Sequence, residues 1–159
     1  MIDGIDGTLG AVGGAVGAQA SCYTAGVMAS VFTRIIAGEL PAHFVWREDE
    51  CVAFLSREPL RPGHTLVVPR AEVDHWIDLD QETLATLMRV ARTIARAQQA
   101  AYRPTKVGLL IAGLEVPHVH LHVSPIDGMH DMDFASVSPF PGDEALAAEA
   151  ARIRAALPR

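Results

Sequence analysis

Three histidines alternate with aliphatic residues in the stretch PHVHLHV, residues 117–123. Successive side chains of a β-strand point to opposite faces, so His118, His120 and His122 would share one face and the aliphatic residues the other. Such alternation is typical of a strand with one face buried in a hydrophobic core and one face free for other chemistry. The stretch therefore predicts a half-buried strand that presents three imidazoles together.

The histidine pattern alone leaves three interpretations open. Alternating histidines can be ordinary surface or core residues, with no chemical role. Two histidines two residues apart on a strand can also share a zinc ion with a third ligand from elsewhere. Finally, an imidazole that is neutral near pH 7 can act as a nucleophile or as a proton carrier.

A second segment, residues 59–70, reads PLRPGHTLVVPR: a Pro/Gly turn, His64, and a short aliphatic strand that ends at a proline. Together with the alternating histidines it resembles the histidine triad (HIT) family of nucleotide hydrolases and transferases. Residues 32–41 and 51–55 are similar to the first two landmarks of that family. The likeness runs from about Ser30 to Leu157.

The resemblance implies a two-step reaction at the α-phosphate of a nucleoside phosphoramidate, acyl-nucleotide or dinucleoside polyphosphate. His120, the middle histidine, would attack the phosphorus and carry the nucleotide covalently until water releases it. A histidine nucleophile needs its far ring nitrogen protonated and held by an acceptor, which a strand carbonyl can supply. His122 and His64 would donate to phosphate oxygens, with His118 completing the catalytic set. The implied partner is a small purine nucleotide, and the scheme requires neither a cofactor nor a metal.

Two other functions stay open beside this hydrolase. The first is a nucleotide-binding or regulatory module that keeps the pocket but turns over slowly or not at all. The second is a metal-dependent hydrolase with His118, His120 and His122 as ligands. Three ligands on one straight strand do not converge on a tetrahedral ion without help, so the sequence disfavours this second alternative.

The chain departs from the family pattern at three places. Ser56 stands where relatives carry an Asp or Asn that holds the ribose hydroxyls, and a serine offers no bidentate carboxylate. Leu114 and Glu115 replace a Gln and a following Ser or Thr, and Glu115 could act as a general acid if burial favoured its protonated form. Ser30 and Thr33 replace a Cys-x-x-Cys that contributes to a structural zinc in many bacterial relatives, so we expect that zinc to be absent. The expected neighbours of the base are apolar: Phe32, Ile36, Phe54 and Leu55.

The remaining pattern predicts an α+β domain, a five-stranded antiparallel sheet with one long helix and a C-terminal helix, and the resemblance implies that this is the HIT-like fold. Apolar residues at helical spacing, with Asp80 as a cap and Pro104 after the end, predict the long helix over residues 80–103. Residues 125–142 read as a long loop, after which Asp143 would cap the final helix. The predicted strands are residues 43–47, 51–55, 65–69, 106–112 and 119–124.

Residues 1–29 are rich in glycine and alanine, which predicts a disordered extension. The HIT domain would then comprise residues 30–159, and Met28 is a candidate for the biological start of the protein.

A net charge of -6 without a basic stripe argues against nucleic-acid and anionic-membrane partners. No apolar run reaches the roughly 18 residues that a spanning helix needs. Two cysteines are too few for a disulfide framework, which favours the cytoplasm. The resemblance also implies a homodimer formed through the long helix and the adjacent strand.

Overall fold

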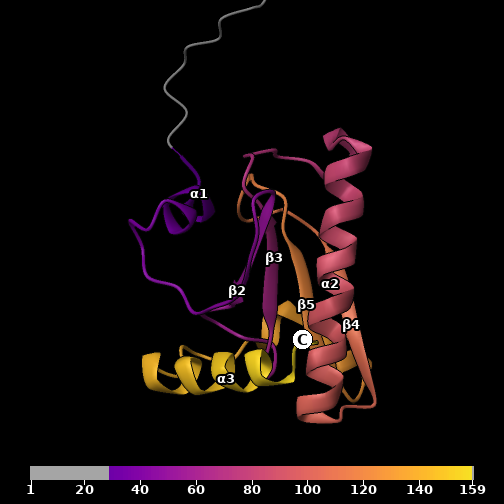
Figure 1. The fold of residues 1–159 in the computed structure, drawn as a ribbon. Helices are drawn as coiled ribbons and strands as arrows, with labels where there is room; N and C mark the ends of the chain where they lie inside the picture. The colour runs from indigo at the N-terminus through magenta and orange to yellow at the C-terminus, as the bar shows by residue number, and fades with distance from the viewer. Residues whose placement is uncertain (1–28, 159) are drawn as a thin grey trace, which may run out of the picture.

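A computed structural model describes residues 29–158 and shows one five-stranded sheet with helices on both of its faces (Figure 1). The spatial order is β1-β2-β3-β5-β4, and every neighbouring pair is antiparallel. The predicted fold class is therefore confirmed. The strands are β1 (Phe44–Arg47), β2 (Cys51–Leu55), β3 (Thr65–Pro69), β4 (Lys106–Ile111) and β5 (Leu121–Ile126). The α-helices are α1 (Val31–Ile36), α2 (Gln81–Tyr102) and α3 (Asp143–Ala156).

The sheet separates two hydrophobic clusters. Along β2, Ala53 packs into the larger cluster with α2 and α3, while Phe54 packs into a smaller cluster with Phe32 of α1. The same alternation continues in β5, where Leu121 and Val123 belong to the larger cluster. Figure 1 shows α1 and α2 on opposite sides of the sheet. His122, which lies between Leu121 and Val123 in β5, therefore turns to the opposite face of the sheet, the face that carries α1.

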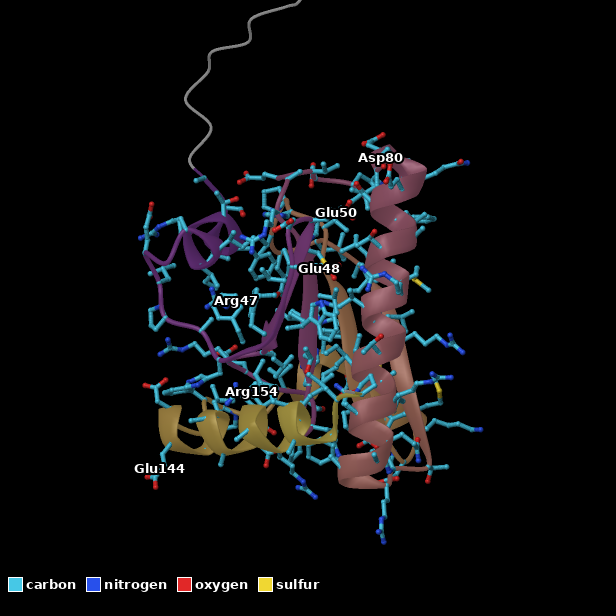
Figure 2. All side chains as sticks on the ribbon, viewed as in Figure 1. Arg47, Glu48, Glu50, Asp80, Glu144 and Arg154 are labelled. Carbon is cyan, nitrogen blue, oxygen red and sulfur yellow. The ribbon has the colours of Figure 1, made fainter. Side chains whose placement is uncertain are left out.

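The long helix begins and ends close to the predicted residues. Asp80 caps it, because its Oδ1 accepts the backbone N–H of Thr83 at 2.8 Å, and Figure 2 shows Asp80 at that end of α2. Arg103 ends the helix in a left-handed conformation with a φ of 54°. Within residues 29–158, no helix combines the length and the apolar character needed to cross a membrane.

The C-terminal segment differs from the prediction in three details. β5 extends to Ile126, and two short 3-10 helices, Met129–Met132 and Phe134–Ser136, interrupt the expected loop. Gly142, not Asp143, occupies the N-cap position of α3, with a φ of 98°. Glycine adopts that backbone angle without the strain a side chain would cause, so it can occupy the N-cap, and the helix begins at Asp143, one residue earlier than predicted. At the other end of α3, Arg154 donates to the carbonyl oxygen of Phe44 at 2.7 Å and so holds α3 against β1 (Figure 2).

The prediction of a disordered extension falls outside the described residues, apart from Ala29.

Candidate functional site

Two of the three alternating histidines open onto one cavity. His122 lies in β5 and His120 directly precedes that strand, and both line a cavity of about 490 Å³ on the α1 face of the sheet. His64, which directly precedes β3, lines the same cavity. His118 is fully buried behind them and is not a lining residue. The alternation places His120 and His122 at the cavity wall, and the antiparallel pairing of β3 with β5 brings His64 beside them.

The ring of His120 is fixed by the backbone two residues before it. Its Nδ1 lies 2.8 Å from the carbonyl oxygen of His118, and a carbonyl oxygen can only accept, so Nδ1 carries the proton. In a neutral imidazole the other nitrogen then keeps its lone pair. No residue between 29 and 158 hydrogen-bonds to His120 Nε2, and this atom is thus free to attack an electrophile in the cavity.

A chain of hydrogen bonds sets the opposite polarity on His122. The backbone N–H of Leu60 donates to Nδ1 of His64 at 3.1 Å, so His64 must carry its proton on Nε2. That Nε2–H donates to Nδ1 of His122 at 3.0 Å. The proton of His122 is therefore on Nε2. At the cavity wall, His120 and His122 thus offer different groups, a lone pair on His120 and an N–H on His122.

Burial keeps all four imidazoles neutral. Burial, followed by the charges of His122 and His120, lowers the pKa of His64 to about 3. Burial, followed by the charge of His120, lowers the pKa of His122 to about 4. Burial also lowers the pKa of His120 and of His118, although in each ring a hydrogen bond to a backbone carbonyl opposes the shift. At neutral pH the hydrogen-bond assignments above therefore apply to uncharged rings.

His118 has both ring nitrogens engaged inside the protein. Its Nε2 donates to the carbonyl oxygen of Pro69 at 2.9 Å, and its Nδ1 accepts the hydroxyl of Ser30 at 2.7 Å. Ser30 also caps α1, since its hydroxyl oxygen accepts the backbone N–H of Thr33 at 3.1 Å. The carboxylate of Glu72 accepts the backbone N–H of Ser30 and the hydroxyl of Thr33, and these bonds lower the pKa of Glu72. His118 therefore cannot share a metal with the other two histidines.

Aromatic rings lie on both sides of the histidine pair. The ring of Phe32 is 4.9 Å from that of His120, and the ring of Phe134 is 4.8 Å from that of His122. Phe134 lies in the segment that follows β5. Asp131 fixes this segment to the rest of the domain, because its carboxylate accepts a hydrogen bond from Arg61 at 2.9 Å. The predicted base neighbours Phe32, Phe54 and Leu55 line the cavity, and so does Ser56 from the predicted ribose position. Ile36 does not, and instead packs against the smaller hydrophobic cluster.

Of the residues that depart from the family pattern, Ser56 and Glu115 line the cavity and Leu114 does not. Glu115 is a lining residue, but its side chain is exposed, so the burial on which the general-acid hypothesis depended is not present. Leu114 points to solvent with 93% of its surface exposed. The hydroxyl of Ser56 donates to the carbonyl oxygen of Glu58 at 3.0 Å and can therefore only accept from a ligand.

Three supporting residues were not predicted. The sequence marks Ser30 only as a position where a zinc ligand of the relatives is missing, and it predicts no role for Phe134. Gln98 of α2 is fully buried, and its amide donates to the carbonyl oxygens of Gly63 and Val123, next to His64 and His122. Gln98 follows Ile94 by four positions and so lies on the apolar stripe of the helix. A polar residue on that stripe was the sequence signal that could have identified it.

Two solved structures show the same fold. A hypothetical histidine triad nucleotide-binding protein from Sulfolobus tokodaii has a TM-score of 0.68 and 28% identity, covering 79% of this chain and 89% of that one. A zinc-bound histidine triad family protein from Mycobacterium smegmatis has a TM-score of 0.69 and 27% identity, covering 79% of this chain and 91% of that one.

The zinc expected of many bacterial relatives does not fit the residues present here. The oxygens of Ser30, Thr33 and Glu72 bond directly to one another or to His118, with Ser30 Oγ at hydrogen-bonding distance from His118 Nδ1. Structural zinc sites use thiolates, imidazoles and carboxylates, and two neutral hydroxyls are poor substitutes. In the described part of the chain, no three His, Cys, Asp or Glu side chains are arranged to hold a metal ion.

Sequence comparison agrees with the structural likeness. An uncharacterized HIT-like protein from Mycobacterium tuberculosis is 37% identical over 103 residues, which cover 62% of this chain and 72% of the relative. A model of the HIT domain matches residues 37–129, more than half of the chain. That match includes the four histidines whose geometry is described above. The chain therefore belongs to the histidine triad (HIT) family.

Proposed function

We propose that this protein is a hydrolase that acts at the α-phosphate of a nucleoside phosphoramidate, acyl-nucleotide or dinucleoside polyphosphate. One observation carries the proposal: the Nδ1–H of His120 is held by the carbonyl of His118, which leaves the Nε2 lone pair facing the cavity. The family supports a hydrolase or transferase, and the Sulfolobus tokodaii relative is named as nucleotide-binding. The purine preference and the cytoplasmic location stay predictions.

The reaction has two displacements at phosphorus. In the first, the Nε2 lone pair of His120 forms a bond to the α-phosphorus, and the bond to the amine, carboxylate or phosphate leaving group breaks with its electron pair. In the second, water attacks the same phosphorus, the phosphorus–nitrogen bond breaks, and His120 recovers its lone pair as the nucleoside monophosphate leaves. An amine leaving group takes up a proton from solvent in the first displacement, and the proton that water loses in the second displacement returns to solvent.

His122 is placed to stabilise the charge that forms on the phosphate. Its Nε2–H is the free donor at the end of the chain that starts at the Leu60 amide and passes through His64. A donor fixed in advance needs no reorganisation when negative charge develops, and removing such a donor typically costs about 10² to 10³ in rate. His64 contributes by holding this ring in the required tautomer.

The charges around the cavity favour some leaving groups over others. Three acidic residues, Glu58, Glu115 and Asp143, line the cavity with a single arginine, Arg57. A chain of several phosphates would bring further negative charge close to these carboxylates. We therefore expect an amine or acyl leaving group to be preferred over a polyphosphate.

The alternative of a slow nucleotide-binding module has its own support. The hydroxyl of Ser56 is already used as a donor, and the exposed Glu115 replaces a hydroxyl-bearing residue beside the leaving group. Either change could slow the reaction without closing the cavity. The two functions differ in turnover, because both require the nucleotide to bind.

Turnover of adenosine 5'-phosphoramidate and of a dinucleoside polyphosphate by the wild type and by His120→Ala, with and without EDTA, tests the proposal. The hydrolase account expects release of adenosine monophosphate that EDTA does not change and that His120→Ala abolishes. Binding of adenosine monophosphate without turnover of either substrate would instead support the binding module. Turnover that EDTA abolishes would support the metal-dependent alternative.

We also propose that the protein forms a homodimer through α2 and β4. β4 lies at the edge of the sheet beside α2 (Figure 1), so one side of its backbone has no neighbouring strand within residues 29–158. Leu109 of β4 and Met88 of α2 are each more than 40% exposed and border an apolar hollow of about 100 Å³. A second copy related by twofold symmetry would cover both apolar side chains and pair the two edges.

A further inference from the structure

Ser30 connects two parts of the site that are far apart in the sequence. Its hydroxyl has one proton to donate, and the acceptor is Nδ1 of His118, 88 residues along the chain and 2.7 Å away. Pro69 fixes the direction of that bond, because its carbonyl occupies the protonated Nε2 of the same ring. Ser30 and His118 are both buried, so water does not compete for the bond.

The same hydroxyl oxygen also starts α1. It accepts the backbone N–H of Thr33, which makes Ser30 the N-cap of the helix that carries Phe32. The ring of Phe32 in turn packs against His118 and His120, with centroid distances of 5.9 Å and 4.9 Å. One side chain thus holds both the helix that forms a wall of the cavity and the residue that holds His120.

We propose that Ser30 is a positioning residue for His120, which it holds through His118. The route is short: Ser30 fixes the His118 ring, and the backbone carbonyl of His118 accepts Nδ1–H of His120. The assignment rests on the proposed function, in which His120 Nε2 attacks phosphorus. A shift of His118 of a fraction of an ångström would turn the His120 lone pair away from the line of attack, and small misplacements of reacting groups cost up to about 100-fold in rate.

Ser30→Ala removes both hydrogen bonds of the hydroxyl, and Asp80→Ala is its matched control. Asp80 caps α2 in the same way as Ser30 caps α1, but Figure 2 shows it at the end of α2, and it does not line the cavity. Both variants should lower the melting temperature. We expect Ser30→Ala to lower kcat about tenfold or more with little change in KM, Asp80→Ala to leave kcat unchanged, and Ser30→Thr to restore it, since threonine keeps the hydroxyl.

A second readout requires no turnover. In ¹⁵N-detected imidazole spectra of the wild type, His118 should show a hydrogen-bonded Nδ1 without a proton, and His120 should show a protected Nδ1–H. Ser30→Ala should shift the His118 Nδ1 signal toward that of a free imidazole and should speed exchange of the His120 Nδ1–H, whereas Asp80→Ala should change neither. Unchanged imidazole signals in folded Ser30→Ala would overturn the positioning role. If the wild type turned over no nucleotide, the proposed function would fail, and these spectra would still decide the role of Ser30.

Discussion

Nε2 of His64 lies 3.0 Å from Nδ1 of His122, although 58 residues separate the two in the chain. The Leu60 amide at the other side of His64 fixes which nitrogen carries the proton. The pair therefore acts as a unit that delivers one N–H, on His122, to the cavity. His64 contributes to the chemistry through this tautomer.

Replacement of His64 by alanine should therefore slow catalysis while leaving the nucleophile in place. His122 loses its donor, its ring can adopt the other tautomer, and kcat should fall by roughly 10²-fold. The unpaired Leu60 amide should also cost about 1–3 kcal/mol in the free energy of unfolding. Steady-state kinetics and urea denaturation measure the two effects. His75→Ala, which changes an exposed histidine, is the control and should alter neither; an equal loss of kcat in both variants would contradict the role of His64.

Acid should destabilise the protein between about pH 6.5 and pH 4. The folded-state pKa values of His64 and His122, about 3 and about 4, lie below the ordinary histidine value of 6.5. In this range the unfolded chain binds more protons than the folded one, so the stability present above pH 6.5 is lost as the pH falls. Each proton contributes about 1.4 kcal/mol per pH unit, which gives a loss approaching about 4 kcal/mol at about pH 5 for the pair.

Urea denaturation at several pH values measures this dependence. His122→Gln should reduce its slope by close to one proton, and His75→Gln should leave the slope as it is. A free energy of unfolding that stays constant from pH 7 to pH 5 would show that the two buried imidazoles titrate normally.

Phe134→Ala should weaken the site although the residue lies beyond the part of the chain that matches the HIT domain, residues 37–129. Its ring packs edge-on against His122 at 4.8 Å, and an aromatic pair of this kind contributes about 0.5–1.5 kcal/mol. We expect kcat/KM to fall about 2-fold to 10-fold. Met129→Ala, in the same segment but 82% exposed and outside the cavity, should have no effect. Equal kinetics for the two variants would mean that Phe134 is only part of the fold.

Leu109→Glu should dissociate the proposed dimer. The substitution places a charge on the exposed edge strand β4, where the second copy would bury it without a partner. Light scattering after size-exclusion chromatography should give a dimer for the wild type and a monomer for the variant. Ile77→Glu, a change at another exposed apolar residue, should remain a dimer. A wild type that is monomeric at all concentrations would contradict the assembly.

The period-two pattern of residues 117–123 predicted the two faces of β5 correctly, because alternation in a strand is a local property. The start of that strand was predicted two residues too early, since the backbone N–H of Val119 bonds to the carbonyl of Val73 and not to a neighbouring strand. The N-cap of α3 was also misplaced by one residue, because the backbone angle of Gly142 is not visible in the hydrophobic pattern.

The supporting hydrogen bonds could not be predicted in this way. The hydroxyl of Ser30 meets His118, and the amide of Gln98 meets Gly63, only after the chain has folded, since neither partner is close in sequence. The resemblance to the family gave the residues of the cavity wall. Their proton positions follow from contacts with backbone groups, which sequence alone does not place.

The central claim is that His120 carries the nucleotide covalently, and trapping that adduct tests it most directly. The protein should be mixed with adenosine 5'-phosphoramidate, quenched in alkali within a single turnover, digested and mapped by mass spectrometry. The account predicts a gain of one adenylyl group on the peptide with residues 117–123, assigned to His120, in the wild type and in His75→Ala, and no such gain in His120→Ala. Wild-type protein that releases adenosine monophosphate at full rate without labelling His120, at any time before the first turnover is complete, would contradict it.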